Sequence, residues 1–421
     1  MSVAVTPPRW RALFIVALAA LAAPGLSACS STPDPTASTT SPDAGLLPIS
    51  NARLDQIFGG ATTEQFNGFA TGDGYFDLPF YPADGLGPVY VNTSCGECHN
   101  NGLRGPGFDQ RMVMVEADGV TTAADQSPIK YGNEIRTLLT AGATTPVTPP
   151  DLPNVKVTSR TPPAVLGRGY IEAVLDSEIQ RVAAAQASRS DGIHGRINYV
   201  AYASQTTADP AFNAHKFGDV VIGRFGLKAR VATLDDFTAD AFQNDMGITS
   251  PMRPSELPNP DGLTDDEHPG VDIGITLVDQ IATYMRLTAI PTRGTLTAAG
   301  TALFDQCQCS VCHVPTLHTR ADYPIAQLAD IDAPIYSDLL LHDMGPALAD
   351  GMPDGTATSS EFRTTPLIAL KYMQAYLNDG RAHTLEDAIQ LHGGEATASV
   401  AAFQQLSDAD RATLLAYVNA L

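Results

Sequence analysis

The sequence has few basic residues, few cysteines and almost no tryptophan. Its 421 residues include 25 Lys and Arg against 46 Asp and Glu, and the formal net charge is −21. This acidic excess argues against nucleic acid and anionic lipid as partners. The single Trp, Trp10, lies near the N-terminus, and the apolar run that follows it, Ala12 to Ala23, is too short to span a bilayer comfortably.

The N-terminus has the form of an export signal. Arg9 and Arg11 precede the apolar run, which leads into the sequence Leu26-Ser27-Ala28-Cys29. This pattern predicts a bacterial lipoprotein signal peptide over residues 1–28, with cleavage before Cys29 and lipidation of its thiol. An ordinary secretory signal cut at about the same place is the alternative, and both signals export the protein.

After the signal, the sequence predicts a periplasmic or cell-surface lipoprotein on a flexible tether. Residues 29–50 are rich in Ser, Thr, Pro and Asp and cannot build a core, so we expect them to form a disordered tether. Ser30 stands where lipoproteins retained at the inner membrane usually have Asp, which favours an outer-membrane anchor. The lipid is then the only expected attachment to the membrane.

Four of the six cysteines belong to two Cys-x-x-Cys-His motifs. Two thiols three positions apart can bond to the two vinyl groups of one porphyrin, and the adjoining His then lies beneath the ring as an axial iron ligand. A redox dithiol or a split zinc site of four thiolates does not require the His, so both alternatives explain less. The motifs predict two covalently bound haem c groups, attached at Cys95, Cys98, Cys309 and Cys312, with His99 and His313 as the proximal iron ligands.

An internal repeat accompanies the two motifs. Each motif is followed by an Arg-Thr-x-Pro element, which begins at Arg160 in the first half and at Arg363 in the second. An Arg-x-x-Thr-Leu element then begins at Arg230 and at Arg381. The same order twice indicates two related domains.

The repeat sets the expected domain boundaries. We expect an N-terminal domain at 51–290 and a C-terminal domain at 294–421, joined by a short seam at 291–294. The two repeated elements lie 70 residues apart in the first half and 18 apart in the second. The first domain therefore carries an insert, at about 176–223, whose alternating apolar positions predict short strands and loops.

Helical patterns indicate the fold class. Each half closes on an amphipathic helix, Leu277 to Leu287 and Ser407 to Leu421, and Thr297 can cap a helix just before the second motif. Gly300 on that helix permits a close crossing with the terminal helix, which is how class I cytochromes c pack. The expected fold is mainly α, with two tandem class I cytochrome c-like domains, the first enlarged by the insert.

These features resemble the bacterial dihaem cytochrome c peroxidase superfamily. Several blocks resemble more specifically its branch of dihaem oxidoreductases, sometimes labelled thiol oxidoreductase-like, and the resemblance runs from about residue 85 to the end. The blocks lie at 223–229, 245–249, 337–345, 379–381 and 392–396.

The resemblance implies an oxidoreductase of peroxidase type with unequal haems. The haem on His99 is expected to be catalytic and the haem on His313 to relay electrons. A haem with His on one face and Met on the other has no open position, which suits a relay. Met344 is the expected sixth ligand of the second haem, with Met352 and His342 as alternatives. A dihaem electron-transfer cytochrome without peroxidase activity is the alternative function.

Further site residues follow from the resemblance. Peroxide cleavage needs an acid/base group near the distal oxygen, and Asp245 and Gln243 lie in the corresponding stretch, although Asp245 could equally be a helix-end carboxylate. Arg160 and Arg363 are expected to bind haem propionates or to order the loop ahead of each proximal side. The superfamily commonly has a Trp between its haems, near Leu227, and its absence here argues against a Trp radical.

The remaining expectations concern partners and spare side chains. The resemblance implies a redox protein as electron donor or acceptor, peroxide or another small oxidant as substrate, and a calcium ion for which the sequence names no ligands. Cys307, the odd thiol, is either buried and inert or a site of incorrect haem attachment. His383 and His392 are expected to be exposed or packing residues.

Overall fold

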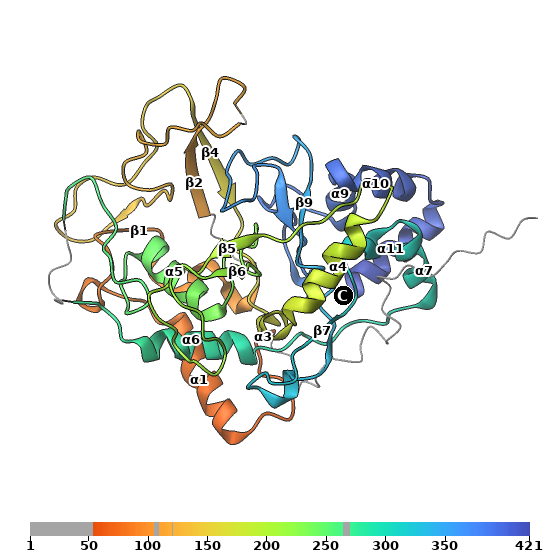
Figure 1. Cartoon of the computed structure of the whole chain (residues 1–421), viewed down its shortest axis with the longest axis horizontal. Coiled ribbons are helices and arrows are strands. Elements are labelled where there is room, and N and C mark those ends of the chain that lie inside the picture. Colours follow the sequence, from red (N-terminus) through yellow and green to blue (C-terminus); the bar gives the residue numbers. More distant parts are fainter. Residues whose placement is uncertain (1–53, 105–108, 120, 264–269) are drawn as a thin grey trace, which may run out of the picture. The chain divides into compact units, whose positions relative to one another are not determined.

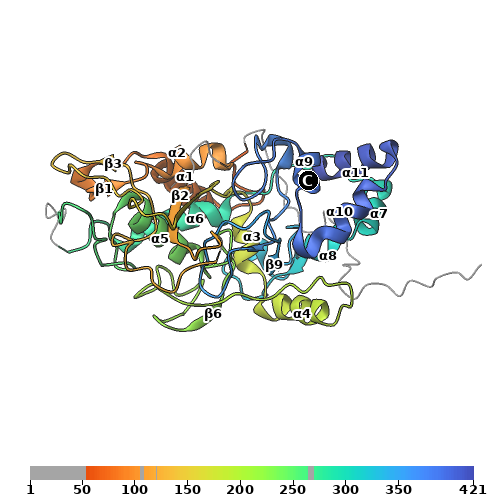
Figure 2. The ribbon, with the colours of Figure 1, turned by 90° about the horizontal axis from the view of Figure 1, so that it is seen from above.

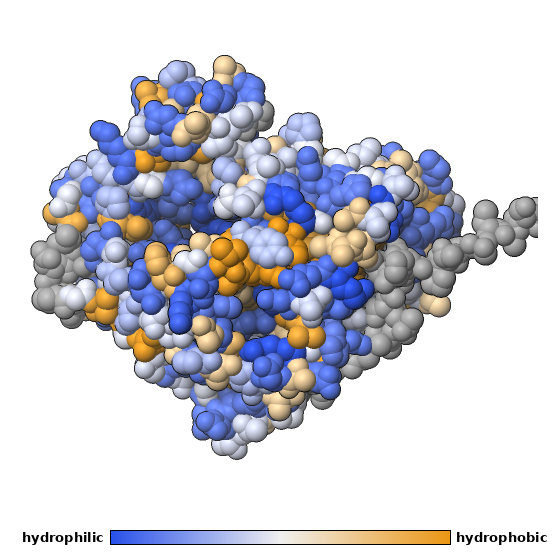
Figure 3. Space-filling view, viewed as in Figure 1, coloured by the Kyte–Doolittle hydropathy of each residue, from blue (hydrophilic) through white to orange (hydrophobic). Residues whose placement is uncertain are grey.

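The computed structural model describes residues 54–104, 109–119, 121–263 and 270–421. The expected signal peptide at 1–28, the tether at 29–50 with Cys29, and Trp10 lie outside these residues, so export and lipidation stay predictions. The described residues belong to one compact unit. None of the helices described in them has the length and apolar character needed to cross a membrane. Hydrophilic side chains cover most of the face drawn in Figure 3, with apolar side chains gathered near its centre.

Helices are the main regular structure, and the strands pair only in twos (Figure 1). The helices are α1 (Thr63–Asp77), α2 (Cys95–Cys98), α3 (Arg168–Ala173), α4 (Asp176–Ala187), α5 (Leu234–Met246), α6 (Ile275–Leu287), α7 (Ala298–Gln306), α8 (Cys309–Cys312), α9 (Leu385–Gln390), α10 (Thr397–Gln404) and α11 (Asp408–Ala420). The strands are β1 (Val89–Tyr90), β2 (Asp109–Met114), β3 (Leu138–Leu139), β4 (Val155–Arg160), β5 (Tyr199–Ala201), β6 (Val220–Ile222), β7 (Leu317–His318), β8 (Asp332–Ala333), β9 (Leu341–Asp343) and β10 (Glu361–Arg363).

All of the described sheets are antiparallel pairs. They join β1 to β3, β2 to β4, β5 to β6, β7 to β8 and β9 to β10. The longest ladder, β2–β4, pairs Asp109 with Arg160 and Met114 with Val155. The mainly α character expected from the sequence is therefore confirmed, while the assignment of each half to the class I cytochrome c fold stays a prediction.

Helices α1, α5 and α6 pack together in the first half of the chain. The expected helix from Leu277 to Leu287 is confirmed as α6, and its apolar positions Val278, Ile281 and Met285 are buried because they recur at helical spacing. The ring of Tyr284 on the same helix lies 5.2 Å from that of Phe69 on α1, measured between centroids. These three helices form the part of the apolar core against which the first motif packs.

Helices α7 and α11 cross closely, and they lie side by side in both ribbon views (Figure 1, Figure 2). The Thr297 hydroxyl caps α7 by accepting a hydrogen bond of 3.1 Å from the Gly300 amide, and Ser407 caps α11 in the same way. A Cβ atom at Gly300 would lie 2.6 Å from Cβ of Tyr417, so only glycine fits this crossing. The expected caps and the expected close approach are confirmed.

The insert differs from its expected structure. Its first part, Asp176 to Ala187, is the helix α4, in which Ile179, Val182 and Gln186 form one buried face. The expectation of strands and loops was wrong there because the run of small residues in this segment hid a helical period. The later part does form the short strands β5 and β6.

The two halves share their largest apolar core. One cluster of buried side chains contains Leu166 and Ile171 from before the expected seam, and Val314, Leu317 and Leu339 from after it. A second, smaller cluster contains only residues of the second half, centred on Phe304, Tyr336 and Tyr417. The division into two domains stays a prediction, but the halves are joined by packing as well as by sequence.

Candidate haem sites

The first Cys-x-x-Cys-His motif forms a single helical turn. Residues Cys95 to Cys98 make up α2, and the Ser94 hydroxyl caps it by accepting a 3.3 Å hydrogen bond from the Glu97 amide. The His99 amide donates to the Cys95 carbonyl at 2.9 Å. Because residues three apart lie on the same face of a turn, both thiols face one side with His99 just beyond them.

The second motif repeats this turn. Residues Cys309 to Cys312 form α8, and the His313 amide donates to the Cys309 carbonyl, again at 2.9 Å. None of the described cysteines is in a disulfide. Burial raises the pKa of the Cys95 thiol to about 12 and also raises that of Cys309, so the thiols are protonated at neutral pH.

Both histidines expected to be proximal ligands are neutral imidazoles. Burial lowers the pKa of His99 to about 4, an effect that the Pro163 carbonyl opposes, and burial lowers the pKa of His313 to the same value. The Nδ1 atom of His313 lies 3.1 Å from the Tyr336 carbonyl oxygen. Because a carbonyl only accepts, Nδ1 carries the proton and Nε2 keeps the lone pair that an iron ion would need.

A cavity lies beside His99. Most of its lining is apolar and includes Leu234 and Phe237 from the start of α5. Two cationic side chains, Arg168 and Arg363, also line it. A mostly apolar wall with a few charged groups is the usual environment of a bound organic cofactor.

Within the part of the chain that the structure describes, no carboxylate pairs with the arginines near this cavity. Arg168 donates through Nε to the Ala164 carbonyl at 2.6 Å, Arg363 to the Gly226 carbonyl at 3.0 Å, and Arg104 through Nη2 to the Leu377 carbonyl at 2.5 Å. The pKa of Arg168 is lowered to about 9, chiefly by burial and then by the charges of Arg363 and Arg104. Buried like charges without counterions call for an anion, and the two propionates of a haem fit this requirement.

The two arginines of the repeated element therefore have different surroundings. Arg363 lines the cavity beside His99, although its repeated element follows the second motif in the sequence. Arg160 donates to Asp350 through Nε at 3.1 Å and Nη2 at 2.7 Å, and to Asp354 through Nη1 at 2.7 Å. With its charge matched by two carboxylates, Arg160 ties the halves together, and its contacts do not favour the expected binding of a propionate.

Asp245 lies beside the first motif, at the C-terminal end of α5. The pKa of Asp245 is raised to about 7, chiefly by burial and then by the charge of Asp109, while the charge of Arg111 opposes the shift. Its carboxylate in turn raises the pKa of Cys95 and of Cys98. The structure thus places Asp245 near the first motif, and its role as an acid/base group stays a prediction.

Gln243, the other expected catalytic residue, is directed elsewhere. Its Nε2 atom donates a 2.7 Å hydrogen bond to the Ser255 carbonyl, in an exposed setting. The side chain holds the segment after α5 in place. Its contacts suit a structural residue.

A network of charged side chains around Asp245 escaped the sequence interpretation. Arg111 on β2 contacts Asp109 at 2.9 Å and Glu134 at 3.0 Å, and Arg230 pairs with Asp240. Of these residues, only Arg230 belongs to an element that the sequence repeats, and the others come together only in the structure. The one available signal was the presence of Arg111 in a chain with few basic residues.

The expected Trp position between the halves is occupied by Leu227, which is buried. Its carbonyl accepts a 2.8 Å hydrogen bond from the Arg363 amide. The backbones of the two halves therefore meet at this point.

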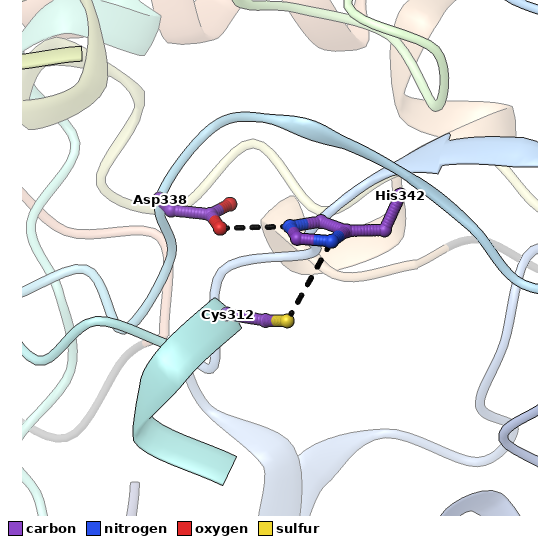
Figure 4. A group of neighbouring side chains, drawn as sticks. All are labelled: Cys312, Asp338 and His342. Atoms are coloured by element: carbon purple, nitrogen blue, oxygen red, sulfur yellow. Dashed lines mark hydrogen bonds and ion pairs between the residues drawn. The ribbon is translucent and has the colours of Figure 1, made fainter. Parts of the chain in front are cut away.

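Near the second motif, His342 has both ring nitrogens engaged. Nε2 lies 2.8 Å from Asp338, Nδ1 lies 2.7 Å from Glu395, and the same Nδ1 is 3.8 Å from Sγ of Cys312 (Figure 4). Cys312, Asp338 and His342 are close enough to hold a metal ion together. A thiol committed to a haem cannot serve such an ion, and a histidine with both nitrogens bonded has none left for iron.

The two methionine candidates lie in different places. Met352 is buried against Val113 and Val115, two residues of the first half, and its sulfur accepts from Asn133 at 3.8 Å. Met344 is half-buried just after β9, where its amide donates to the Ser360 carbonyl at 2.9 Å. Its selection as a ligand stays a prediction.

A residue expected to be exposed or packed, His392, lies near His313. After burial, the largest influence on the lowered pKa of His313 is the charge of His392. His392 is half-buried just beyond α9, and its Nδ1 atom lies 2.6 Å from the Ala388 carbonyl oxygen. The only sequence signal was its place in the His-Gly-Gly-Glu-Ala block.

Comparison with known families gives the class of the protein. A family model described as "Di-haem oxidoreductase, putative peroxidase" matches residues 151–421, and the chain belongs to this family. The matched region contains the second motif and begins after the first. No curated protein sequence matches the chain.

Several solved structures are distantly similar to this chain. The dihaem peroxidase BthA from Burkholderia thailandensis is 14% identical, with 91% of this chain and 89% of that chain covered and a TM-score of 0.37. Hydrazine synthase from Kuenenia stuttgartiensis is 15% identical over 89% and 99% of the two chains, with a TM-score of 0.34. A MauG-like protein associated with microbial copper homeostasis is 15% identical over 59% and 89%, with a TM-score of 0.29. At these TM-scores the similarity does not establish a shared fold.

Proposed function

We propose that the protein is an exported dihaem c-type oxidoreductase of peroxidase type, with a catalytic haem at His99 and an electron-relay haem at His313. The observation that carries the proposal is the cavity beside His99, where a neutral histidine lies with arginines that pair with no carboxylate of the described residues. The cavity beside His99 therefore offers the groups that one of the two proposed haems would require.

The first haem would be held at three kinds of contact. Cys95 and Cys98 would form its thioether bonds, and His99 would bind its iron. Arg168 and Arg363 would neutralise its propionates, which explains why both remain without carboxylate partners. When bound, the haem supplies a redox-active iron whose open face can bind a small oxidant.

Asp245 would supply the proton chemistry. A carboxyl group with a pKa of about 7 is protonated and ionised in comparable amounts at neutral pH, so it can both accept and donate a proton. The negative charge of Asp109 favours the protonated form of Asp245, and the positive charge of Arg111 favours the ionised form. Gln243 would act only by holding the chain after α5.

The second haem would exchange electrons with a partner protein. Cys309 and Cys312 would attach it and His313 would bind its iron. The acidic net charge suits a basic redox protein as the partner. Anchoring through a lipid on Cys29, at the periplasmic side of the outer membrane or at the cell surface, is part of the same proposal, as is a calcium ion.

Haem content and electron paramagnetic resonance test the proposal. The purified protein should contain two covalently bound haems per chain, and the mixed-valence form should show a high-spin signal that peroxide abolishes. The variant His99→Ala should lose that signal and keep the signal of the second haem. Two low-spin signals that do not respond to peroxide would exclude peroxidase activity and leave an electron-transfer cytochrome.

A further inference from the structure

His313 and His392 are oriented by the same kind of hydrogen bond. Nδ1 of His313 donates to the Tyr336 carbonyl, and Nδ1 of His392 donates to the Ala388 carbonyl. Each ring therefore keeps its lone pair on Nε2, and no described residue makes a hydrogen bond to Nε2 of either ring. A histidine with Nδ1–H on a backbone carbonyl and a bare Nε2 has the usual form of a metal ligand.

Contacts bring the segment that carries His392 to the same part of the second half as the turn that carries His313, although 79 positions separate the two residues in the sequence.

The segment around His392 is fixed against the second motif by a chain of contacts. A Cβ atom at Gly394 would collide with the Asp343 carbonyl on β9, so the segment can approach β9 this closely only with glycine there. Glu395 accepts from the Asp343 amide at 3.1 Å and contacts His342 at 2.7 Å. His342 in turn lies 3.8 Å from Cys312 (Figure 4).

Packing places α9 on the same side of the second motif. Leu385 and Ile389, two residues of α9, pack against the second apolar cluster, and so does Cys309. His392 follows α9 by two residues. The helix that positions His392 and the turn that positions His313 therefore rest on one core.

These observations favour His392 over the other candidates. His342 has no nitrogen left, and Met352 is packed against the first half of the chain. Met344 is the remaining rival, since its carbonyl would lie 3.0 Å from a Cβ atom at Gly393, next to His392. We propose that His392 is the sixth ligand of the iron at His313, which is then bound by two histidines. This proposal rests on the haem proposed at His313.

This ligation has a consequence for the relay. An axial Met raises the reduction potential of a haem relative to an axial His. The haem on His313 should therefore have a lower potential than a His–Met haem in the same pocket. It also has no open position and binds no peroxide.

Replacement of His392 in the full-length holoprotein tests the proposal, with Met344→Leu as the matched control. Near-infrared magnetic circular dichroism of the ferric wild type should show the signature of two nitrogen ligands. His392→Gly should lose this low-spin signature, and added imidazole should restore it. Met344→Leu should keep both the spectrum and the potential of the wild type. Restoration by imidazole separates loss of a ligand from misfolding.

The opposite pattern would overturn the assignment. If the wild type shows a sulfur-to-iron charge-transfer band that Met344→Leu abolishes and His392→Gly retains, Met344 is the ligand. Covalent haem content, measured as the pyridine haemochrome, separates the two proposals. If this pattern is found in a protein with two haems per chain, only the assignment of His392 as the ligand is refuted. If the wild type has no haem at Cys309 and Cys312, the proposed function is refuted as well.

Discussion

Buried arginines form two groups in this protein. Arg160 and Arg286 face carboxylates, and Arg286 contacts Glu172 at 2.7 Å with neither side chain open to solvent. Arg168 and Arg363 face only backbone carbonyls. Because a buried cation is costly unless an anion accompanies it, the second group marks where an anionic ligand belongs.

Replacement of Arg363 should change the potential of the first haem. A positive charge near the iron favours the reduced state, so Arg363→Gln should lower the reduction potential by the equivalent of ~1 kcal/mol. Spectroelectrochemical titration of the holoprotein measures the shift. Arg381→Gln, at an exposed ion pair with Asp379, is the control and should leave both potentials in place. Equal potentials in all three proteins would contradict the role of Arg363.

Asp245 should set the pH dependence of peroxide reduction. Its pKa of about 7 lies above the ordinary value, so the folded protein keeps it protonated between about pH 4 and 7, where the unfolded chain ionises it. Its contribution to stability is present below about pH 4 and is lost as the pH rises through 7. Asp245→Asn should lower the rate ~10²–10⁴-fold and remove the change in rate near pH 7.

Steady-state assays of peroxide reduction across the pH range measure this effect. Asp408→Asn, at a fully exposed carboxylate in the first turn of α11, should behave as the wild type. An unchanged pH profile in Asp245→Asn would exclude Asp245 as the acid/base group.

At the scale of secondary structure, the crossing of α7 and α11 depends on one glycine. Gly300→Ala would place a methyl group 2.6 Å from Cβ of Tyr417, and the helices would have to separate. Thermal unfolding should show a loss of about 1–3 kcal/mol of stability, the usual cost of overpacking. Gly74→Ala on α1, where a Cβ meets nothing within 4 Å, should instead be neutral or gain up to ~1 kcal/mol. A stable Gly300→Ala protein would show that the crossing tolerates a larger residue.

Short-range features of the elements could be predicted from the sequence. The capped helices that begin after Thr297 and Ser407, and the small residue at Gly300, follow from patterns spanning a few residues. The structure of α4 and the position of His392 could not be predicted in this way. Predicting α4 required recognising a helical period in a run of small residues. The position of His392 depends on packing between α9, β9 and α8. The same limit applies to Arg363, whose repeat position suggests the second haem although its contacts belong to the first.

At the scale of the whole molecule, Arg160 joins the halves more strongly than an exposed pair could. Arg160→Ala would leave Asp354 buried without its cation and Asp350 with only the 3.4 Å contact to Lys228. We expect a loss of about 3–5 kcal/mol in the free energy of unfolding. Urea denaturation followed by circular dichroism measures it. Arg181→Ala, which removes an exposed pair with Glu178, should cost less than ~1 kcal/mol. Similar losses in both variants would show that the buried contacts contribute little.

Arg160 of the first half contacts carboxylates of the second half, and Arg363 of the second half lines the cavity of the first. These contacts constrain the order in which the chain folds. A ribosome delivers residue 160 long before residues 350 and 354, and the first haem pocket long before Arg363. Until the second half is present, Arg160 has no carboxylates and the pocket beside His99 lacks one of its cations. The first half should therefore remain incompletely folded during synthesis, with Cys95 and Cys98 still accessible, and the two pockets should close together at the end.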